Sequence, residues 1–262
     1  MNNPASSLER ALQDVESDAD GLIKALTAVL KAAKKAKSAA ASGQVRDLEA
    51  ALEAGATLAA QASERAEQLR GDWGFDVGAW FGSGGYTKEL LATAAEAGVQ
   101  AFGSDERVLC YPAIVSLSGS DATISIDKVK DRRIRPSVVV NQLAALQQRP
   151  PKFKPEPFIE SLASAYDLVV AAKGLRPGSP AKLVDVHRVL TLLPGAGRDY
   201  TRQELARDMY LLDQTGVVTT RDARTMSLPA SAMPRGTGVL TTVTRAGQTK
   251  VYAGVAFTGA EK

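Results

Sequence analysis

Two stretches of the chain, residues 8–29 (LERALQDVESDADGLIKALTAV) and residues 45–69 (VRDLEAALEAGATLAAQASERAEQL), repeat apolar side chains in steps of three and four. This spacing places the apolar side chains on one narrow stripe of an α-helix, as in helices that pack against a partner helix. Because a short run of small residues, 38–43, separates the stretches, we expect residues 1–70 to form an antiparallel, coiled-coil-like helical hairpin. The repeating positions are Leu8, Leu12, Val15, Ala19, Leu22, Leu26 and Val29, then Val45, Leu48, Leu52, Gly55, Ala59, Ala62, Ala66 and Leu69.

The hairpin is suited to reach or docking and carries no catalytic groups. Ser6 and Glu9 form the pattern of a capping box for the first helix, which we expect to end near Lys37. The alanine-rich second stripe buries little area and would gain from a third helix, from another chain or from this one. We expect the following residues to mediate contact with a protein partner: Leu8, Leu12, Val15, Leu22, Leu26, Leu48, Leu52, Trp73 and Trp80.

The composition is that of a globular protein with more than one compact unit. The chain has 262 residues, of which 45% are hydrophobic and 23% charged. No run of about eighteen apolar residues is present, so we expect no membrane-spanning helix and no membrane partner. Residues 1–10 lack the pattern of a secretory signal, and the single cysteine, Cys110, fits a reducing cytoplasm. We therefore expect a cytoplasmic protein.

Positive charge is concentrated in the middle and the C-terminal part of the chain. Residues 1–70 hold nine Lys and Arg against ten Asp and Glu, a net charge of −1. Residues 128–154 hold eight basic residues against Asp131 alone, a net charge of +7. Residues 182–262 hold eleven against seven, a net charge of +4. Such clustering favours an acidic partner such as nucleic acid.

The rest of the chain divides into three segments. Residues 71–86 interleave both tryptophans with glycines, which predicts a hinge or docking segment. Residues 87–149 predict a small α/β body: a helix from Thr87, strands over 99–102, 107–117 and 122–127, a β-hairpin turn at 118–121, and a helix from Pro136. The proline-rich run 150–157 is typical of a stiff connector and marks the boundary of the C-terminal unit, residues 150–262. The fold class expected for the whole chain is α+β.

The C-terminal unit has the element order of a winged-helix module. Helices are expected over residues 158–172, 180–193 and 201–214, followed by short strands and a final β-hairpin around residues 246–248. In winged-helix modules the third helix enters the major groove and the hairpin lies along the phosphates. The alternative is that this unit docks on a protein, since a fold does not determine a function.

Two groups of basic residues are candidates for nucleic-acid contact. The first lies at a strand-to-helix junction around residues 128–135, where arginines present forked donors to phosphate oxygens. The second flanks the expected third helix of the C-terminal unit. The alternative for both is a solvated surface neutralised by nearby acids. The candidates are Lys128, Lys130, Arg132, Arg133, Arg135, Lys152, Lys154, Arg198, Arg202, Arg207, Arg221 and Arg224.

Catalytic chemistry finds little support, and we expect no metal and no cofactor. The single histidine, His187, lies between apolar helical positions, and Cys110 is flanked by apolar residues with no nearby base. One histidine and one cysteine cannot form a His/Cys zinc site. A metal-dependent nuclease would need clustered carboxylates and a lysine, and the acid–lysine spacing common in such sites is missing here. The hairpin that could carry such a cluster holds Asp105, Glu106, Asp121, Asp127, Lys128 and Lys130.

We therefore expect a non-enzymatic accessory or adaptor subunit. It would oligomerise or dock through its N-terminal hairpin and contact nucleic acid, such as duplex DNA, through its basic surfaces. A pure protein-interaction subunit of a larger complex is the main alternative, and a metal-dependent nuclease is the third.

Overall fold

The computed structural model describes residues 7–104, 107–148, 154–229 and 238–259. The chain forms two compact units, one of residues 1–89 with 135–137 and one of residues 90–134 with 138–262. Long helices at the N-terminus precede a body of mixed helices and sheets, which confirms the expected mixture of helix and sheet. None of the helices in the described ranges is both long and apolar enough to cross a membrane.

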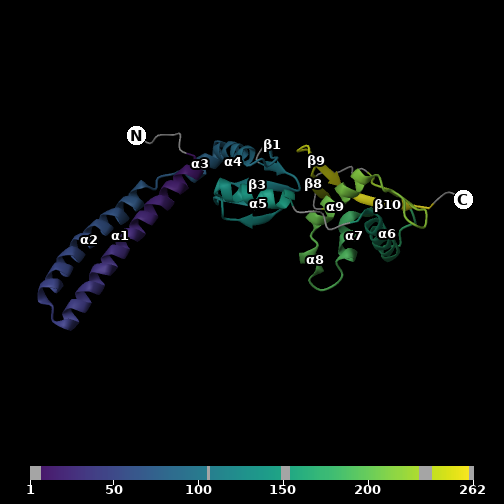
Figure 1. Cartoon of the computed structure of the whole chain (residues 1–262). Coiled ribbons are helices and arrows are strands. Elements are labelled where there is room, and N and C mark those ends of the chain that lie inside the picture. The colour runs from purple at the N-terminus through teal and green to yellow at the C-terminus, as the bar shows by residue number, and fades with distance from the viewer. Residues whose placement is uncertain (1–6, 105–106, 149–153, 230–237, 260–262) are drawn as a thin grey trace. The chain divides into compact units, whose positions relative to one another are not determined.

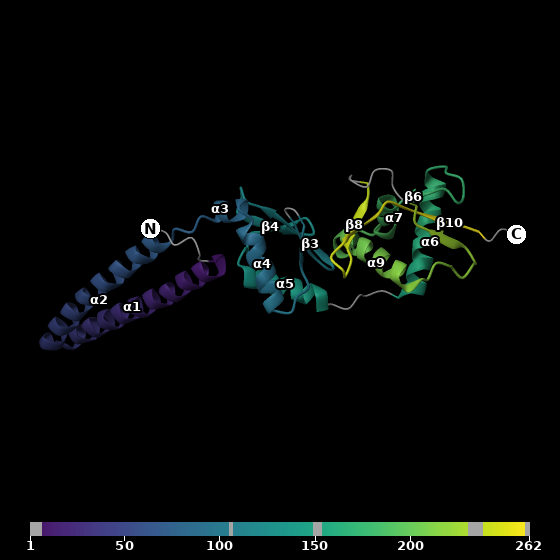
Figure 2. The same ribbon diagram turned by 90° about the horizontal axis from the view of Figure 1, so that it is seen from above.

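The N-terminal segment is a helical hairpin made of α1 (Leu8–Ser42) and α2 (Val45–Asp72). The two helices lie side by side and antiparallel (Figures 1 and 2). The α1 helix begins because the Ser7 hydroxyl accepts a hydrogen bond from the backbone of Arg10, and it ends at Gly43, whose φ of 70° suits glycine. The N-cap is thus Ser7 rather than Ser6, which lies outside the described residues.

Residues 71–86 contain more regular structure than the glycines suggest. They include α3 (Val77–Gly82) and the first turn of α4 (Gly85–Glu96). The Asp76 carboxylate accepts a hydrogen bond from the backbone of Ala79 at 2.9 Å and so starts α3. This local cap outweighs the weak helix propensity of the glycines.

The body contains a five-stranded antiparallel sheet in which each strand pairs with the next along the chain. The expected strand over 107–117 is divided by a turn at Tyr111–Pro112. Asp127 and Lys128 have φ values of 50° and 71°, and they form a tight turn into a fifth strand that the sequence pattern did not predict. The strands are β1 (Phe102–Ser104), β2 (Arg107–Cys110), β3 (Ala113–Ser118), β4 (Thr123–Ile126) and β5 (Val129–Asp131), followed by α5 (Pro136–Gln148).

The C-terminal segment packs three main helices against a three-stranded antiparallel sheet of order β6-β10-β7, and β8 and β9 form a separate hairpin. A capping box begins the third main helix, since Thr201 and Glu204 exchange hydrogen bonds. The elements are α6 (Pro155–Ala172), β6 (Ala181–Lys182), α7 (Leu183–Leu190), α8 (Ala196–Asp199), α9 (Arg202–Thr215), β7 (Thr225–Ser227), β8 (Leu240–Val243), β9 (Thr249–Tyr252) and β10 (Gly254–Thr258).

The expected connector over residues 150–157 is only partly described. Residues 150–153 lie outside the described ranges, and Pro155 already belongs to α6, with Lys154 as its N-cap. Proline at the first helical position costs no hydrogen bond, because that backbone donor has no partner within the helix.

Candidate functional site

The contact between α1 and α2 is made mainly by small side chains. Ala36 and Ala39 of α1 and Ala51 and Ala62 of α2 are buried. By contrast, Leu26 and Leu52, which the heptad pattern assigns to this contact, are both more than half exposed. The hairpin therefore closes on alanines, which let two helices approach closely, and it leaves Leu26 and Leu52 exposed. Of the other expected interaction residues on the two helices, Leu8 is buried, and Leu12, Val15, Leu22 and Leu48 are half-buried.

Three large apolar side chains of α1 are exposed, and we call them the apolar stripe: Ile23, Leu26 and Leu30. Their exposed fractions are 59%, 53% and 54%. An α-helix turns by about 100° per residue, so the three side chains lie about 80–140° around α1 from the buried Ala36. The stripe is therefore separate from the side of α1 that contacts α2.

Val45 and Leu52 of α2 are exposed in the same way, at 61% and 57%. Leu52 follows the buried Ala51 by one residue, so its side chain is rotated by about 100° around the axis of α2 from Ala51. The apolar stripe is rotated around α1 from Ala36 in the same sense. Residues rotated in the same sense on two antiparallel helices emerge on the same side of the pair. The hairpin therefore presents one broad apolar face.

The base of the hairpin is held by two carboxylates: Glu89 caps the N-terminus of α1, and Glu9 caps the N-terminus of α5. Glu89 of α4 accepts hydrogen bonds from the backbone nitrogens of Leu8 and Glu9, at 3.0 and 2.8 Å. Glu9 in turn accepts from the backbone nitrogen of Ser137, in the first turn of α5, at 2.8 Å. Negative charge at a helix N-terminus is stabilising. The hairpin is thus anchored at its base by side chains far apart in sequence.

Arg135 belongs to this anchor. Its guanidinium donates to Glu9 at 2.7 Å and to Glu16 at 2.6 Å. Burial alone raises the pKa of Glu9, but hydrogen bonds from Ser137 and Arg135 outweigh it, and the pKa is lowered overall. A guanidinium held by two carboxylates is poorly placed for a phosphate, although it was a candidate for nucleic-acid contact.

Two further basic residues of the body are also paired. Arg133 forms an ion pair with Asp131 at 2.7 Å, and its hydrogen bonds lower the pKa of that carboxyl. Lys130 pairs with Asp121 at 2.8 Å. Lys128 and Arg132 are exposed, and no ion pair is found for either within the described residues.

The basic candidates of the C-terminal segment also divide into residues that form ion pairs and residues that are exposed. Arg224 donates to Asp167 at 2.8 Å and also pairs with Asp222, while Arg207 pairs with the buried Asp208. The remaining candidates have exposed side chains without an ion pair in the described part of the chain: Lys154, Arg198, Arg202 and Arg221. Lys152 lies outside the described residues.

The helix α9 offers little surface for reading a DNA groove. Leu205, Met209 and Leu212 are buried, and Ala206, Asp208 and Tyr210 are buried as well. The side chain of Arg207, a candidate for nucleic-acid contact, is only 15% exposed. Among the expected contact residues of this helix, Arg202 is the exposed one. The face that a recognition helix requires is therefore largely covered.

The two tryptophans occupy different environments. Trp80 is half-buried, and its indole nitrogen donates to Glu89 at 2.8 Å. Phe75 packs edge-on against it with ring centroids 5.8 Å apart. Trp73 is 42% exposed and stays available for a partner. Trp80 is thus part of the base of the hairpin, whereas Trp73 lies on the surface.

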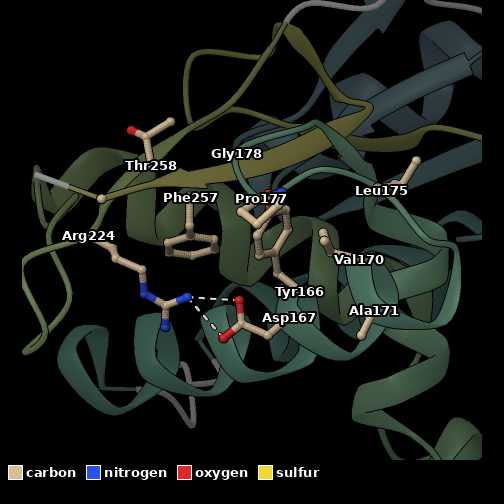
Figure 3. Close-up of a pocket in the computed structure, with 11 residues that line it drawn as sticks. Tyr166, Asp167, Val170, Ala171, Leu175, Pro177, Gly178, Arg224, Phe257 and Thr258 are labelled. Atoms are coloured by element: carbon tan, nitrogen blue, oxygen red, sulfur yellow. Dashed lines mark hydrogen bonds and ion pairs between the residues drawn. The ribbon is translucent and has the colours of Figure 1, made fainter. Parts of the chain in front are cut away.

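An open pocket lies between α6 and β10 (Figure 3). Aromatic and aliphatic side chains, including Tyr166, Val170 and Phe257, line it, and the Arg224–Asp167 ion pair stands at one side. The guanidinium also lies 5.7 Å from the Phe257 ring centroid. Because Arg224 is already neutralised by two aspartates, the pocket lacks a free charge that would hold an anion.

The residues considered for catalysis, His187, Cys110 and Asp127, are buried or form hydrogen bonds within the fold. His187 is buried, and its Nε2 lies 2.8 Å from the backbone oxygen of Tyr200. Burial raises the pKa of Cys110 to about 11, which disfavours a thiolate. The Asp127 carboxylate accepts a hydrogen bond from the backbone of Ile114 at 2.9 Å. Within the described ranges no cluster of three or more His, Cys, Asp or Glu could hold a metal ion, and Asp105 and Glu106 fall outside those ranges.

No family model, no curated protein and no solved structure matches this chain.

Proposed function

We propose that this protein is a non-enzymatic accessory subunit that docks on another protein chain through the apolar face of the α1–α2 hairpin. One observation carries the proposal: the hairpin closes on alanines while Ile23, Leu26 and Leu30 remain exposed together. A contiguous exposed apolar surface on a rod is typical of a protein-interaction site. The carboxylate caps at the base of the hairpin support this role, because they hold the rod at one end.

Site-specific photo-crosslinking tests the docking proposal. A photoreactive amino acid at position 26 is expected to form a covalent adduct with a protein chain in cells. The same group at position 35, where a lysine lies exposed on another side of α1, serves as the matched control. Equal yields at the two positions, or no adduct at position 26, would contradict the proposal.

Nucleic-acid contact is a second candidate function. The C-terminal segment supports it through its element order, because three main helices precede the β8–β9 hairpin, which is the order on which the winged-helix expectation rests. Exposed cations without an ion pair in the described residues add to it, with Lys128 and Arg132 beside the β4–β5 turn. The covered face of α9 favours contact with the phosphate backbone over base reading.

Binding to duplex DNA at two salt concentrations tests this second function. Backbone contact weakens steeply as salt rises. The double variant Lys128→Glu/Arg132→Glu is expected to lose affinity by at least tenfold. Arg188→Glu, at an exposed arginine paired with Asp185, is the control. Equal binding by wild type and double variant would dismiss nucleic-acid contact at this surface and leave docking through the hairpin untouched.

A further inference from the structure

The charges of α1 are segregated along its length. Residues 9–20 hold five acidic residues and one basic residue, whereas residues 24–37 hold five lysines and no acidic residue. The apolar stripe of Ile23, Leu26 and Leu30 lies at the boundary between the two halves. A helix with this arrangement is complementary to itself when two copies run in opposite directions.

From this arrangement we infer that the occupant of the apolar face is a second copy of this chain, packed antiparallel along α1 around a twofold axis near Thr27. The inference rests on the proposed docking function and names its partner. Leu26 of one copy then meets Leu30 of the other, and Asp20 of one copy lies opposite Lys34 of the other. The antiparallel direction follows from charge, because a parallel pair would place Asp20 against Asp20 and Lys34 against Lys34.

Side-chain positions on the helix agree with this pairing. Asp20 and Lys34 are both exposed, and they lie beside the apolar stripe on the side away from α2. In antiparallel helix pairs the charged residues that flank the apolar seam decide orientation. Glu16, which also pairs with Arg135, and Lys37 extend the same complementarity outward from the axis.

The α2 side of the same face is shaped for close approach. Below Leu52 it carries the small, exposed residues Ala56, Ala59 and Ser63. Two hairpins overlapping for about 40 Å, each about 20 Å wide, would cover roughly 800 Å² per copy. That area is about what one partner contributes to a specific interface of ordinary size. The product is a four-helix arrangement that covers the exposed leucines.

Light scattering coupled to size exclusion tests the inference on the full chain. The expected mass is twice the chain mass of 27.6 kDa. The single variants Leu26→Glu and Asp20→Lys are expected to run as monomers, and the double variant Asp20→Lys/Lys34→Asp is expected to recover the dimer. Lys35→Asp, at an exposed lysine on another side of α1, is expected to leave the dimer unchanged.

Disulfide trapping tests the direction of the pairing. In an antiparallel pair, Thr27→Cys places the thiols of the two copies next to each other, near the twofold axis. Lys34→Cys places the two thiols far apart. We expect a covalent dimer from the first and none from the second; equal trapping of both would overturn the antiparallel arrangement. A monomeric wild type whose position 26 still crosslinks to a different protein would overturn self-assembly and leave the docking function standing.

Discussion

The Glu89 carboxylate lies 2.8 Å from the backbone nitrogen of Glu9, eighty residues earlier in the chain. It also accepts from the backbone of Leu8 and from the indole of Trp80. Three donors from two helices therefore meet at one acidic side chain. This convergence turns the end of the long hairpin into an anchored base.

Removing the Glu89 cap should destabilise the hairpin. Glu89→Ala leaves the first donors of α1 and the Trp80 indole without this acceptor, which we expect to cost about 1–2 kcal/mol of unfolding free energy. Urea unfolding followed by circular dichroism measures the loss. Glu96→Ala, at an exposed acid of the same helix, is the control and should change stability far less. Equal losses would contradict the capping role.

Glu9 should make the stability of the hairpin base depend on pH. The pKa of Glu9 is lowered in the folded protein from an ordinary value of 4.5. The stability it contributes is therefore present above pH 4.5 and is lost as the pH falls through the folded pKa. Glu9→Gln should unfold more easily than wild type at pH 7 but nearly equally at pH 2.5. Glu64→Gln, an exposed acid on α2, should show no such difference at either pH.

Asp127 should make stability depend on pH in the direction opposite to that of Glu9. Burial raises its pKa from 3.8 to about 6, although the Ile114 backbone donor opposes the rise. The wild type therefore loses stability as pH rises from about 4 through 6. Asp127→Asn keeps the acceptor and tolerates the positive φ, so at pH 7 it should be more stable by about 1–2 kcal/mol once solvent screening is allowed for. At pH 3.5 the gain should vanish.

Asp121→Asn is the matched control for Asp127. Asp121 lies in the preceding turn, and the hydrogen bond from Lys130 lowers its pKa. Removing this charge should not stabilise the protein at pH 7. A gain at both positions would show that net charge, rather than burial of Asp127, is responsible.

Gly85 should not accept a side chain. A Cβ at this position would lie 2.6 Å from the ring of Trp80, which Glu89 holds in place. We expect Gly85→Ala to cost about 1–3 kcal/mol and to shift the tryptophan fluorescence, because the ring must move. At Gly82 a Cβ would meet nothing within 4 Å, so Gly82→Ala should be neutral or slightly stabilising. Similar effects at both glycines would contradict this packing.

Much of the local structure could be predicted from short-range patterns. The two long helices and the capping box at Thr201 follow from residues at most a few positions apart. The sequence pattern does not predict the fifth strand, because Val129 and Asp131 lie within a run of basic residues that indicates a strand-to-helix junction. Its pairing with β4 depends on the tight turn at Asp127 and Lys128.

The candidate surfaces could be predicted only in part. Counting basic residues could not reveal which were neutralised, since Arg135 pairs with Glu9 across 126 positions of sequence. The same holds for Arg224 and Asp167. Such pairs form only when distant segments meet, so a local charge count overstates the free positive surface.

By itself, the sequence determined that the N-terminal part consists of two helices with apolar residues in steps of three and four, because helix periodicity is a property of neighbouring residues. Only the tertiary structure decided which side of each helix faces the other. Small alanines allow the closest approach of the two backbones, and that packing left Leu26 and Leu52 exposed.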